Sequence, residues 1–336
     1  MQDVAQLAGV SVKTVSNVLS GYEHVSVKMR DRVMVAVGAL DYEINVSARN
    51  LRVGRTRVIG LAVPELSQAY FAELADAVIR AASARGYTVL IEQTAAGPSA
   101  EISAIAAMRK HSIDALIYCP LTLVAGDAEQ LDVDFPLVVL GERVEGSNAD
   151  HVTMSNEGAI RAVTEHLLDQ GCHHVAVLGA HPDGPVGTGA SRLRGFTSAL
   201  HARGIEVDQR LVLTAPLWHR TYGVEAMELL IASGVPFDGV VCFNDALALG
   251  AMRALQRNGL RIPQDVMVTG FDDIEDSAYS TPSLTTVSPG REQIAHAAVD
   301  LVVDSLEGSR IITHPQEIET GFDLVLREST VADLLP

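Results

Sequence analysis

Short apolar runs alternate with helix-like segments from residue 57 to about residue 271, and this alternation limits the possible folds more than any other feature of the chain. One series of runs reads RVIGLAV, YTVLIE, DALIYC and PLVVLG, and a second reads HHVAVLG, GVVCF and VMVTGF. Between them the periodicity predicts helices at 71–85, 100–111, 158–170, 192–203, 221–233 and 246–258. Such alternation is typical of right-handed βαβ units, in which helices cover both faces of a parallel sheet. Two series therefore predict an α/β body of two doubly wound parallel-sheet subdomains.

Charge is divided unevenly along the chain. The formal net charge of −17 argues against nucleic acid when taken alone, because a DNA-binding surface needs Lys and Arg to neutralise phosphates. Residues 1–57, however, carry eight basic and five acidic side chains, a net of +3, so the remainder carries −20. This asymmetry indicates a small basic module that touches an anion, attached to a large acidic body.

The basic module has the pattern of a helix-turn-helix. A short helix is expected over residues 3–8, and Gly9 breaks it. Ser11 is a good N-cap for a second helix, VKTVSNVLS, and Ser26 caps a third that closes a three-helix bundle. Two short helices joined by a tight turn form the DNA-binding motif. A three-helix bundle that binds no nucleic acid is the structural alternative.

The second helix of such a motif enters the major groove by its N-terminal end. Lys13 can donate to guanine O6 and N7, and Asn17 can pair with adenine, while Val12 can contact a thymine methyl group. The residues assigned to base edges are Val12, Lys13, Ser16 and Asn17, and those assigned to phosphates are Thr14, Ser16, Ser20 and His24.

Residues 45–57, NVSARNLRVGRTR, are too polar to pack on a core, yet they carry one large hydrophobic residue, Leu51. This composition predicts a short basic helix that ends at Gly54. An apolar wedge kinks DNA when it enters the minor groove, and basic side chains such as Arg49 and Arg52 bind the negative groove beside it.

The motifs DVAQLAGVSVKTVSNVLSG, HVSVKMRDRV and NVSARNLRVGRTRVIG, followed by ASRLRGFTSAL, VVCFNDALALGAMRAL and GFDDIEDSAYSTPSLTTV, resemble the lactose-repressor and galactose-repressor (LacI/GalR) family over essentially the whole chain. The resemblance implies an all-α headpiece at 1–44, a hinge helix linker at 45–56 and a clamshell body like that of periplasmic binding proteins. The chain would cross between the subdomains near 155, 287 and 313. The first subdomain would then hold 57–155 and 288–313, and the second 156–287 and 314–330.

A ligand cleft is expected beyond the carboxyl ends of the parallel strands. Polar and aromatic side chains follow the strands there, and such groups suit a polyol, whose hydroxyls both donate and accept. By resemblance, Arg192, Asn244 and Asp272 occupy effector-contacting positions, Trp218 stacks on the ligand and Arg291 lines the cleft. The expected effector-binding residues are Tyr70, Phe71, Arg192, Trp218, Asn244, Asp272 and Arg291. Two structural alternatives are that Trp218 only packs and that the neighbouring Asp245 caps the helix beginning at Ala246.

These features together predict a transcription regulator, and we expect it to be a repressor. It would bind a palindromic double-stranded DNA operator as a homodimer and respond to a sugar or sugar derivative. No apolar run is long enough to span a membrane, and the N-terminus shows no basic segment followed by an apolar stretch, so we expect a cytoplasmic protein. No catalytic motif, cofactor or metal site is expected, because GxSxG is absent and the three cysteines lie far apart. The rival functions are a periplasmic-type sugar-binding protein and a regulator that has lost its ligand response.

Overall fold

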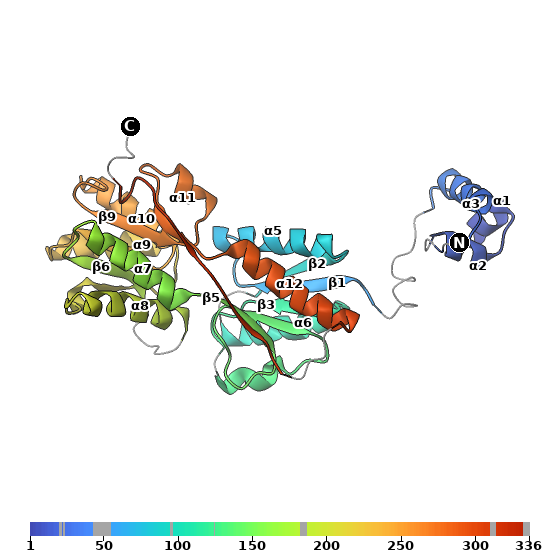
Figure 1. Cartoon of the computed structure of the whole chain (residues 1–336), viewed down its shortest axis with the longest axis horizontal. Coiled ribbons are helices and arrows are strands. Elements are labelled where there is room, and N and C mark those ends of the chain that lie inside the picture. The colour runs from blue at the N-terminus through green and yellow to red at the C-terminus, as the bar shows by residue number, and fades with distance from the viewer. Residues whose placement is uncertain are drawn as a thin grey trace. The chain divides into compact units, whose positions relative to one another are not determined.

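The computed structural model describes residues 1–19, 22, 24–42, 55–94, 97–123, 125–181, 187–309 and 314–331. Contacts divide the chain into two compact units, a headpiece unit of Met1–Thr56 and a body of Arg57–Pro336 (Figure 1). The predicted hinge helix over residues 46–53 lies outside the described residues. Within them, no helix combines the length and apolarity needed to cross a membrane.

The headpiece unit contains the three predicted helices, α1 (Gln2–Ala8), α2 (Val12–Leu19) and α3 (Val27–Ala39). Val4, Val15 and Val33 are fully buried where the helices meet. α1 ends at Gly9 in the left-handed conformation (φ 61°), and Arg32 of α3 donates to the Ala8 carbonyl at 2.6 Å. The backbone N–H of Thr14 donates to Ser11 Oγ at 3.1 Å, which confirms the predicted cap of the second helix.

The first subdomain of the body is built on a sheet with the order β11-β5-β4-β3-β1-β2, in which every pair is parallel. Its strands are β1 (Val58–Val63), β2 (Thr88–Gln93), β3 (Ala115–Tyr118), β4 (Leu137–Leu140), β5 (Asp150–Met154) and β11 (Glu317–Thr320). Helices α5 (Ala69–Ala84) and α12 (Arg291–Glu307) pack with one core cluster, and α6 (Pro98–Lys110) packs with another. Helices on both faces give the predicted doubly wound arrangement.

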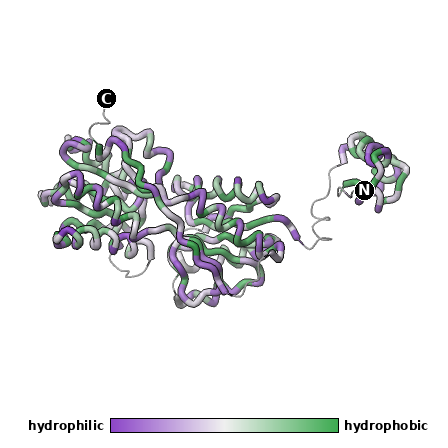
Figure 2. The backbone as a smooth tube through the Cα atoms, viewed as in Figure 1, coloured by the Kyte–Doolittle hydropathy of each residue, from purple (hydrophilic) through white to green (hydrophobic). Residues whose placement is uncertain are grey.

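The second subdomain repeats this plan in the order β12-β10-β9-β8-β6-β7. Its strands are β6 (Val175–Ala180), β7 (Val212–Thr214), β8 (Gly239–Cys242), β9 (Met267–Phe271), β10 (Thr285–Ser288) and β12 (Asp323–Val325), and its helices are α7 (Asn156–Asp169), α8 (Thr188–Ala202), α9 (Arg220–Ser233), α10 (Asp245–Arg257) and α11 (Glu275–Tyr279). Figure 2 shows hydrophobic strands flanked by helices of mixed polarity. The predicted doubly wound parallel sheet is confirmed, and one edge strand, β12, pairs antiparallel with β10.

The chain passes between the two sheets three times. β5 belongs to the first sheet and α7 packs in the second subdomain, while β10 belongs to the second sheet and α12 packs on the first. The predicted third crossing near 313 is wrong, because β11 pairs in parallel with β5 and therefore keeps residues 317–320 in the first subdomain. The crossing falls between β11 and β12, where Thr320 Oγ1 donates to the Pro289 carbonyl at 3.1 Å. Two crossing segments therefore lie side by side.

Helices α9 and α10 approach so closely that only glycine fits between them. A Cβ atom added at Gly250 would overlap the Arg220 carbonyl oxygen, and one added at Gly223 would overlap the Leu247 carbonyl oxygen. Because each obstacle is backbone, no side chain can move aside to relieve it. The start of α9 is consequently fixed against α10.

Gly250→Ala should destabilise the body, whereas Gly38→Ala should stabilise the headpiece. At Gly250 the added Cβ overpacks a close helix contact, which costs roughly 1–3 kcal/mol. At Gly38 the added Cβ meets no described atom within 4 Å, so the higher helix propensity of Ala should stabilise α3 by up to ~1 kcal/mol. Thermal denaturation tests the first change and amide hydrogen exchange of α3 tests the second. An unchanged melting temperature for Gly250→Ala would contradict the close packing.

The stability of the second subdomain should fall below neutral pH because of His166. Its Nε2 lies 2.9 Å from Thr330 Oγ1, and burial lowers the pKa of the imidazole although Asp169 opposes the shift. Since the folded pKa lies below the unfolded value of about 6.5, the stabilisation is complete above about pH 6.5 and is lost as pH falls below it. His166→Gln should flatten the melting temperature between pH 7.5 and 5.5, and the exposed His201→Gln is the matched control. Equal slopes for both variants would refute the assignment to His166.

Candidate functional site

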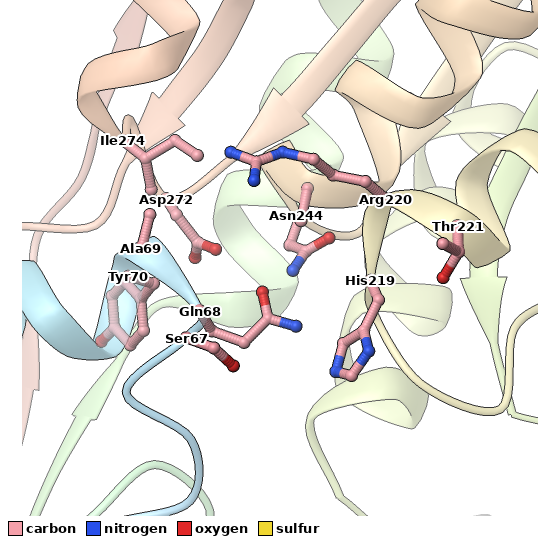
Figure 3. A pocket seen from close by; sticks show the side chains of 11 residues that line it. Ser67, Gln68, Ala69, Tyr70, His219, Arg220, Thr221, Asn244, Asp272 and Ile274 are labelled. Carbon is pink, nitrogen blue, oxygen red and sulfur yellow. The ribbon is translucent and has the colours of Figure 1, made fainter.

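A cavity of about 250 Å³ lies between the two subdomains of the body. Its lining comes from the segment after β1, the start of α9, the start of α10 and the segment after β9, and Figure 3 shows the side chains that converge there. The lining residues are Ser67, Gln68, Ala69, Tyr70, His219, Arg220, Thr221, Asn244, Ala246, Asp272 and Ile274. Three of the predicted effector-binding residues, Tyr70, Asn244 and Asp272, are among them.

Asp272 stands in the cavity wall on a strained backbone. Its φ is 114° and that of Asp273 is 50°, both outside the usual range for non-glycine residues. The N–H of Asp272 donates to the Val287 carbonyl at 2.9 Å, and the Asp273 carboxylate turns away to Arg327 at 2.7 Å. Burial raises the pKa of Asp272 well above its ordinary value, although the positive charge of Arg192 opposes the shift. Its carboxyl group is therefore presented to the cavity at a cost that the surrounding fold must offset.

Arg192 is buried behind the cavity rather than in its lining. Its Nε donates to Asn156 Oδ1 at 2.9 Å, Nη1 donates to the Phe243 carbonyl and Nη2 contacts the Met154 sulfur at 3.3 Å. The guanidinium lies 3.5 Å from the centre of the Phe271 ring. Burial lowers the pKa of Arg192 to about 10, and the negative charge of Asp272 opposes that shift. Arg192 thus supports Asp272 electrostatically, while each of its three nitrogens contacts another protein atom.

Trp218 and Asn244 tie the start of α9 to the start of α10. The indole Nε1 donates to the Gly179 carbonyl at 3.0 Å, and the ring packs edge-on to Phe243 with centroids 5.8 Å apart. Asn244 Oδ1 accepts from the Leu247 N–H at 2.9 Å, and its Nδ2 donates to the Trp218 carbonyl at 3.0 Å. Trp218 is not among the residues that line this cavity, and its stacking on a ligand stays a prediction.

Asp245 does not cap α10, and that expectation is wrong because Asn244 occupies the N-cap. The Asp245 carboxylate is fully buried and accepts hydrogen bonds from Ile274 N–H at 3.0 Å, from Ser277 Oγ at 2.7 Å and from Thr286 Oγ1. It therefore joins α10 to the segment that carries Asp272.

The remaining predicted effector residues lie around the cavity at different depths. The Tyr70 ring lines it and packs edge-on to Phe71 at 5.3 Å, whereas Phe71 itself packs against the core of the first subdomain. Arg291 begins α12 and reaches Glu73 Oε2 at 2.8 Å and the carbonyl oxygens of Asp272 and Asp273 at 3.2 and 3.3 Å. Phe71 and Arg291 therefore brace the cavity from outside its lining.

Further polar contacts join the subdomains across the cavity, in addition to those from Arg291 to the Asp272 and Asp273 carbonyl oxygens. His219 Nε2 lies 3.0 Å from Glu65 Oε2, Gln68 Nε2 donates to the Trp218 carbonyl at 3.3 Å, and Glu275 N–H donates to Glu73 Oε1 at 3.0 Å. Sequence reasoning found Tyr70 but missed its neighbours Ser67, Gln68 and Ala69, and it missed His219, Arg220 and Thr221 at the start of α9. The rule that ligands bind after strand ends could have found them, because Gln68 follows β1 and His219 follows β7.

The described part of the DNA-binding set lies on or near α2. Val12 and Lys13 are exposed and Ser16 and Asn17 are half-buried, whereas Thr14 Oγ1 is 2.9 Å from Ser11 Oγ. His24 is exposed and lies edge-on to Tyr22. The predicted DNA-binding residues that lie outside the described residues are Ser20, Arg49, Leu51 and Arg52.

Two family models match the chain. Residues 1–45 match the bacterial regulatory proteins of the lacI family, and residues 164–330 match the periplasmic binding protein-like domain. The ribose operon repressor of Halalkalibacterium halodurans is 33% identical over 98% of this chain and 96% of its own length. The similarity to this relative therefore extends from the headpiece through both subdomains.

Solved structures with similar folds include three with bound molecules. A lac repressor dimer bound to operator and the anti-inducer ONPF is 26% identical, with 98% of each chain covered and a TM-score of 0.87. A complex of the transcriptional regulator CelR with cellobiose is 29% identical, with 98% of each chain covered and a TM-score of 0.73. A sugar-binding regulator from Escherichia coli in complex with phosphate is 27% identical, covering 82% of this chain and 98% of that one with a TM-score of 0.68.

Proposed function

The chain belongs to the lacI family of bacterial regulatory proteins. From this membership we propose that it is a repressor whose affinity for a palindromic operator is controlled by a small sugar-like effector bound in the cavity of the body. The observation that carries the proposal is that one chain combines an exposed recognition helix with a polar cavity between two subdomains. Such a regulator acts on the chromosome and therefore works in the cytoplasm.

Operator binding as a homodimer is supported by the geometry of the headpiece. α2 presents Val12 and Lys13 outward at its N-terminal end, and that end of the recognition helix reads base edges in this motif. A single recognition helix of eight residues reads only a few base pairs, so a second copy related by a two-fold axis lengthens the site. The operator should therefore be an imperfect palindrome.

Effector binding is supported by the chemistry of the cavity wall. Asp272 offers a carboxylate, Asn244 and Gln68 offer amides, and Tyr70 offers a hydroxyl beside an aromatic face. Sugar hydroxyls need both donors and acceptors, while the C–H face of a sugar packs on a ring. A volume of about 250 Å³ suits a small ligand.

We propose that the effector acts through the hinge segment, residues 46–53. An isolated helix of eight residues is marginal in water, so a hinge helix there would order only when DNA and a partner hinge support it. Insertion of Leu51 must offset a few kcal/mol of base unstacking. A ligand that shifts the first subdomains of the two partners therefore needs to bias only a weak element. A periplasmic-type binding protein, the rival function, has no use for the headpiece that occupies residues 1–45.

Lys13→Ala should reduce operator affinity at one base step in each half-site by roughly 1–3 kcal/mol, because a base contact made in the major groove is lost. Lys28→Ala removes the same charge from the exposed start of α3 and is the matched control. Binding to a panel of operators mutated one base at a time measures the effect. An equal loss on every sequence would show instead that Lys13 contacts a phosphate.

Asp272→Asn should abolish the response to the effector while ligand-free operator affinity stays nearly unchanged. The substitution keeps the shape and tolerates the positive φ but removes the carboxylate from the cavity wall. Asp273→Asn, whose carboxylate contacts Arg327 instead, should keep the response. In the wild type and in Asp273→Asn, the effector should change operator affinity by roughly 5- to 150-fold, which is typical of allosteric coupling. In Asp272→Asn it should cause no such change. A normal response from the Asp272→Asn variant would show that this cavity is not the effector site.

A further inference from the structure

We propose that Arg32 is a positioning residue for DNA recognition. It fixes the turn between α1 and α2, and through that turn it fixes the orientation of the recognition helix, without contacting DNA itself. The inference rests on the proposed function, in which α2 reads the operator. Arg32 is one of the eight basic side chains of residues 1–57, and by charge alone it would be assigned to a phosphate. Its contacts are with the turn instead.

The guanidinium group of Arg32 is bound to the carbonyl groups of the turn. Its Nη2 donates to the Ala8 carbonyl at 2.6 Å and lies 3.5 Å from the Gly9 carbonyl oxygen. It packs so closely that a Cβ atom added at Gly9 would lie 2.9 Å from the same nitrogen. No carboxylate in the part of the chain that the structure describes pairs with this guanidinium. The positive charge of Arg32 is therefore directed at two backbone oxygens.

The carbonyl groups at the end of α1 need a donor from outside that helix. The last four C=O groups of a helix have no partner within it, and a nearby cation stabilises the C-terminal end of a helix. The N–H of Val10 turns back to the Ala5 carbonyl at 3.0 Å, a bond that does not involve the Ala8 carbonyl. Arg32 supplies a donor to Ala8 from α3 and so ties the end of α1 to the third helix.

The turn determines how α2 is presented. α2 begins at Val12, only three residues after Gly9. Val15 anchors α2 in the core of the headpiece, but apolar contacts are non-directional and allow a helix to rotate. The hydrogen bond from Arg32 to the turn is directional, so it fixes the orientation that the core leaves open.

Loss of this hydrogen bond should affect specific and non-specific binding differently. A base contact requires its donors to be positioned to within roughly 0.5 Å, so it depends on the orientation of α2. Attraction to phosphates depends on charge and on salt rather than on a single orientation. A positioning residue therefore controls the preference for the operator, whereas a phosphate contact controls the affinity for all DNA.

The test measures both kinds of binding in the full chain. The wild type selects its operator from a random-sequence duplex library, and an unrelated duplex of equal length is the non-specific probe. Arg32→Met keeps an extended side chain but removes its donors. In this variant the ratio of operator affinity to unrelated-duplex affinity should fall about tenfold, the effect of one charge-assisted hydrogen bond. Lys28→Met removes the same charge from the exposed start of α3 and should keep the wild-type ratio. A wild-type ratio in Arg32→Met would overturn the inference.

Salt dependence separates positioning from a phosphate contact. Each phosphate contact adds about 0.9 to the magnitude of the slope of log affinity against log salt concentration. On the unrelated duplex, Arg32→Met should keep the wild-type slope. A slope smaller by about 0.9, with equal losses of affinity on both duplexes, would make Arg32 a phosphate contact and would contradict the proposal.

Gly9→Ala tests whether Arg32 acts through the turn. The added methyl group would displace the guanidinium and would also strain the left-handed backbone. In the Arg32→Met background only the backbone strain remains, so Gly9→Ala should reduce operator affinity less than it does in the wild type. Effects that simply add in the double variant would show that the two residues act independently, contrary to the inference.

Amide hydrogen exchange without DNA reports on the headpiece itself. In Arg32→Met, the amides of Thr14 and Val15 at the start of α2 should exchange faster, while α3 keeps its protection. Unchanged exchange at these amides would show that Arg32 does not hold the turn, and loss of protection throughout the three helices would show that it acts only on stability. Either result would overturn the inference. A wild type that selects no operator would contradict the proposed function instead, and the exchange result would still decide whether Arg32 holds the turn.

Discussion

The buried carboxylate of Asp245 is the interaction on which the geometry of the cavity depends. It receives hydrogen bonds from Ile274, Ser277 and Thr286, and so joins the start of α10 to the segment after β9 and to β10. Burial raises its pKa to about 7, while these three bonds favour the charged form. A buried charge is tolerated only when its lone pairs are satisfied, and the donors here come from three separate elements. The segment that carries Asp272 is thereby held in its strained conformation.

Opening and closing of the cavity depend on much weaker contacts. The pair between Glu65 and His219 is partly exposed, and each of the other cross-cavity hydrogen bonds, including two from Arg291, has a backbone group as one partner. Exposed ion pairs contribute about 0–1 kcal/mol each, so a small ligand that bridges the two walls can compete with all of them. The crossing segments are in contact with one another, because Thr320 Oγ1 donates to the carbonyl oxygens of Thr153 and Pro289. The segment that carries Asp272 is held firmly, whereas the contacts between the two subdomains across the cavity are weak. This combination suits a site that closes when a ligand binds.

Sequence patterns predicted β1 to β4, β6, β8 and β9, because buried parallel strands read as continuous apolar runs, but they gave no strand at β5, β7 or β10 and no helix at α12. They could not predict the crossing at 321–322, since three of the four residues in the segment EIET of β11 are polar and the strand lies at the sheet edge. Nor could they decide between Asn244 and Asp245 as the cap of α10, because both residue types cap helices equally well. Only the fold shows that Ser277 and Thr286 surround Asp245. Arg192 and Trp218 were likewise identified by type and position, but their commitment to Asn156 and to the Gly179 carbonyl depends on tertiary contacts.

The uneven charge also shapes how such a molecule controls DNA. Residues 58–336 carry a net charge of −20 and are repelled by phosphates, so attraction has to come from the first 57 residues, whose net charge is only +3. Small changes in how those residues are presented then have large effects on affinity. The body begins at Arg57, which adopts a left-handed φ of 56°. Its backbone N–H donates to Asp114 Oδ2 at 2.7 Å, and its guanidinium carbon lies 5.5 Å from the centre of the Tyr87 ring. β1 begins directly after Arg57 and leads to the segment that lines the cavity. A shift of the first subdomain therefore moves the cavity lining and the start of the body together.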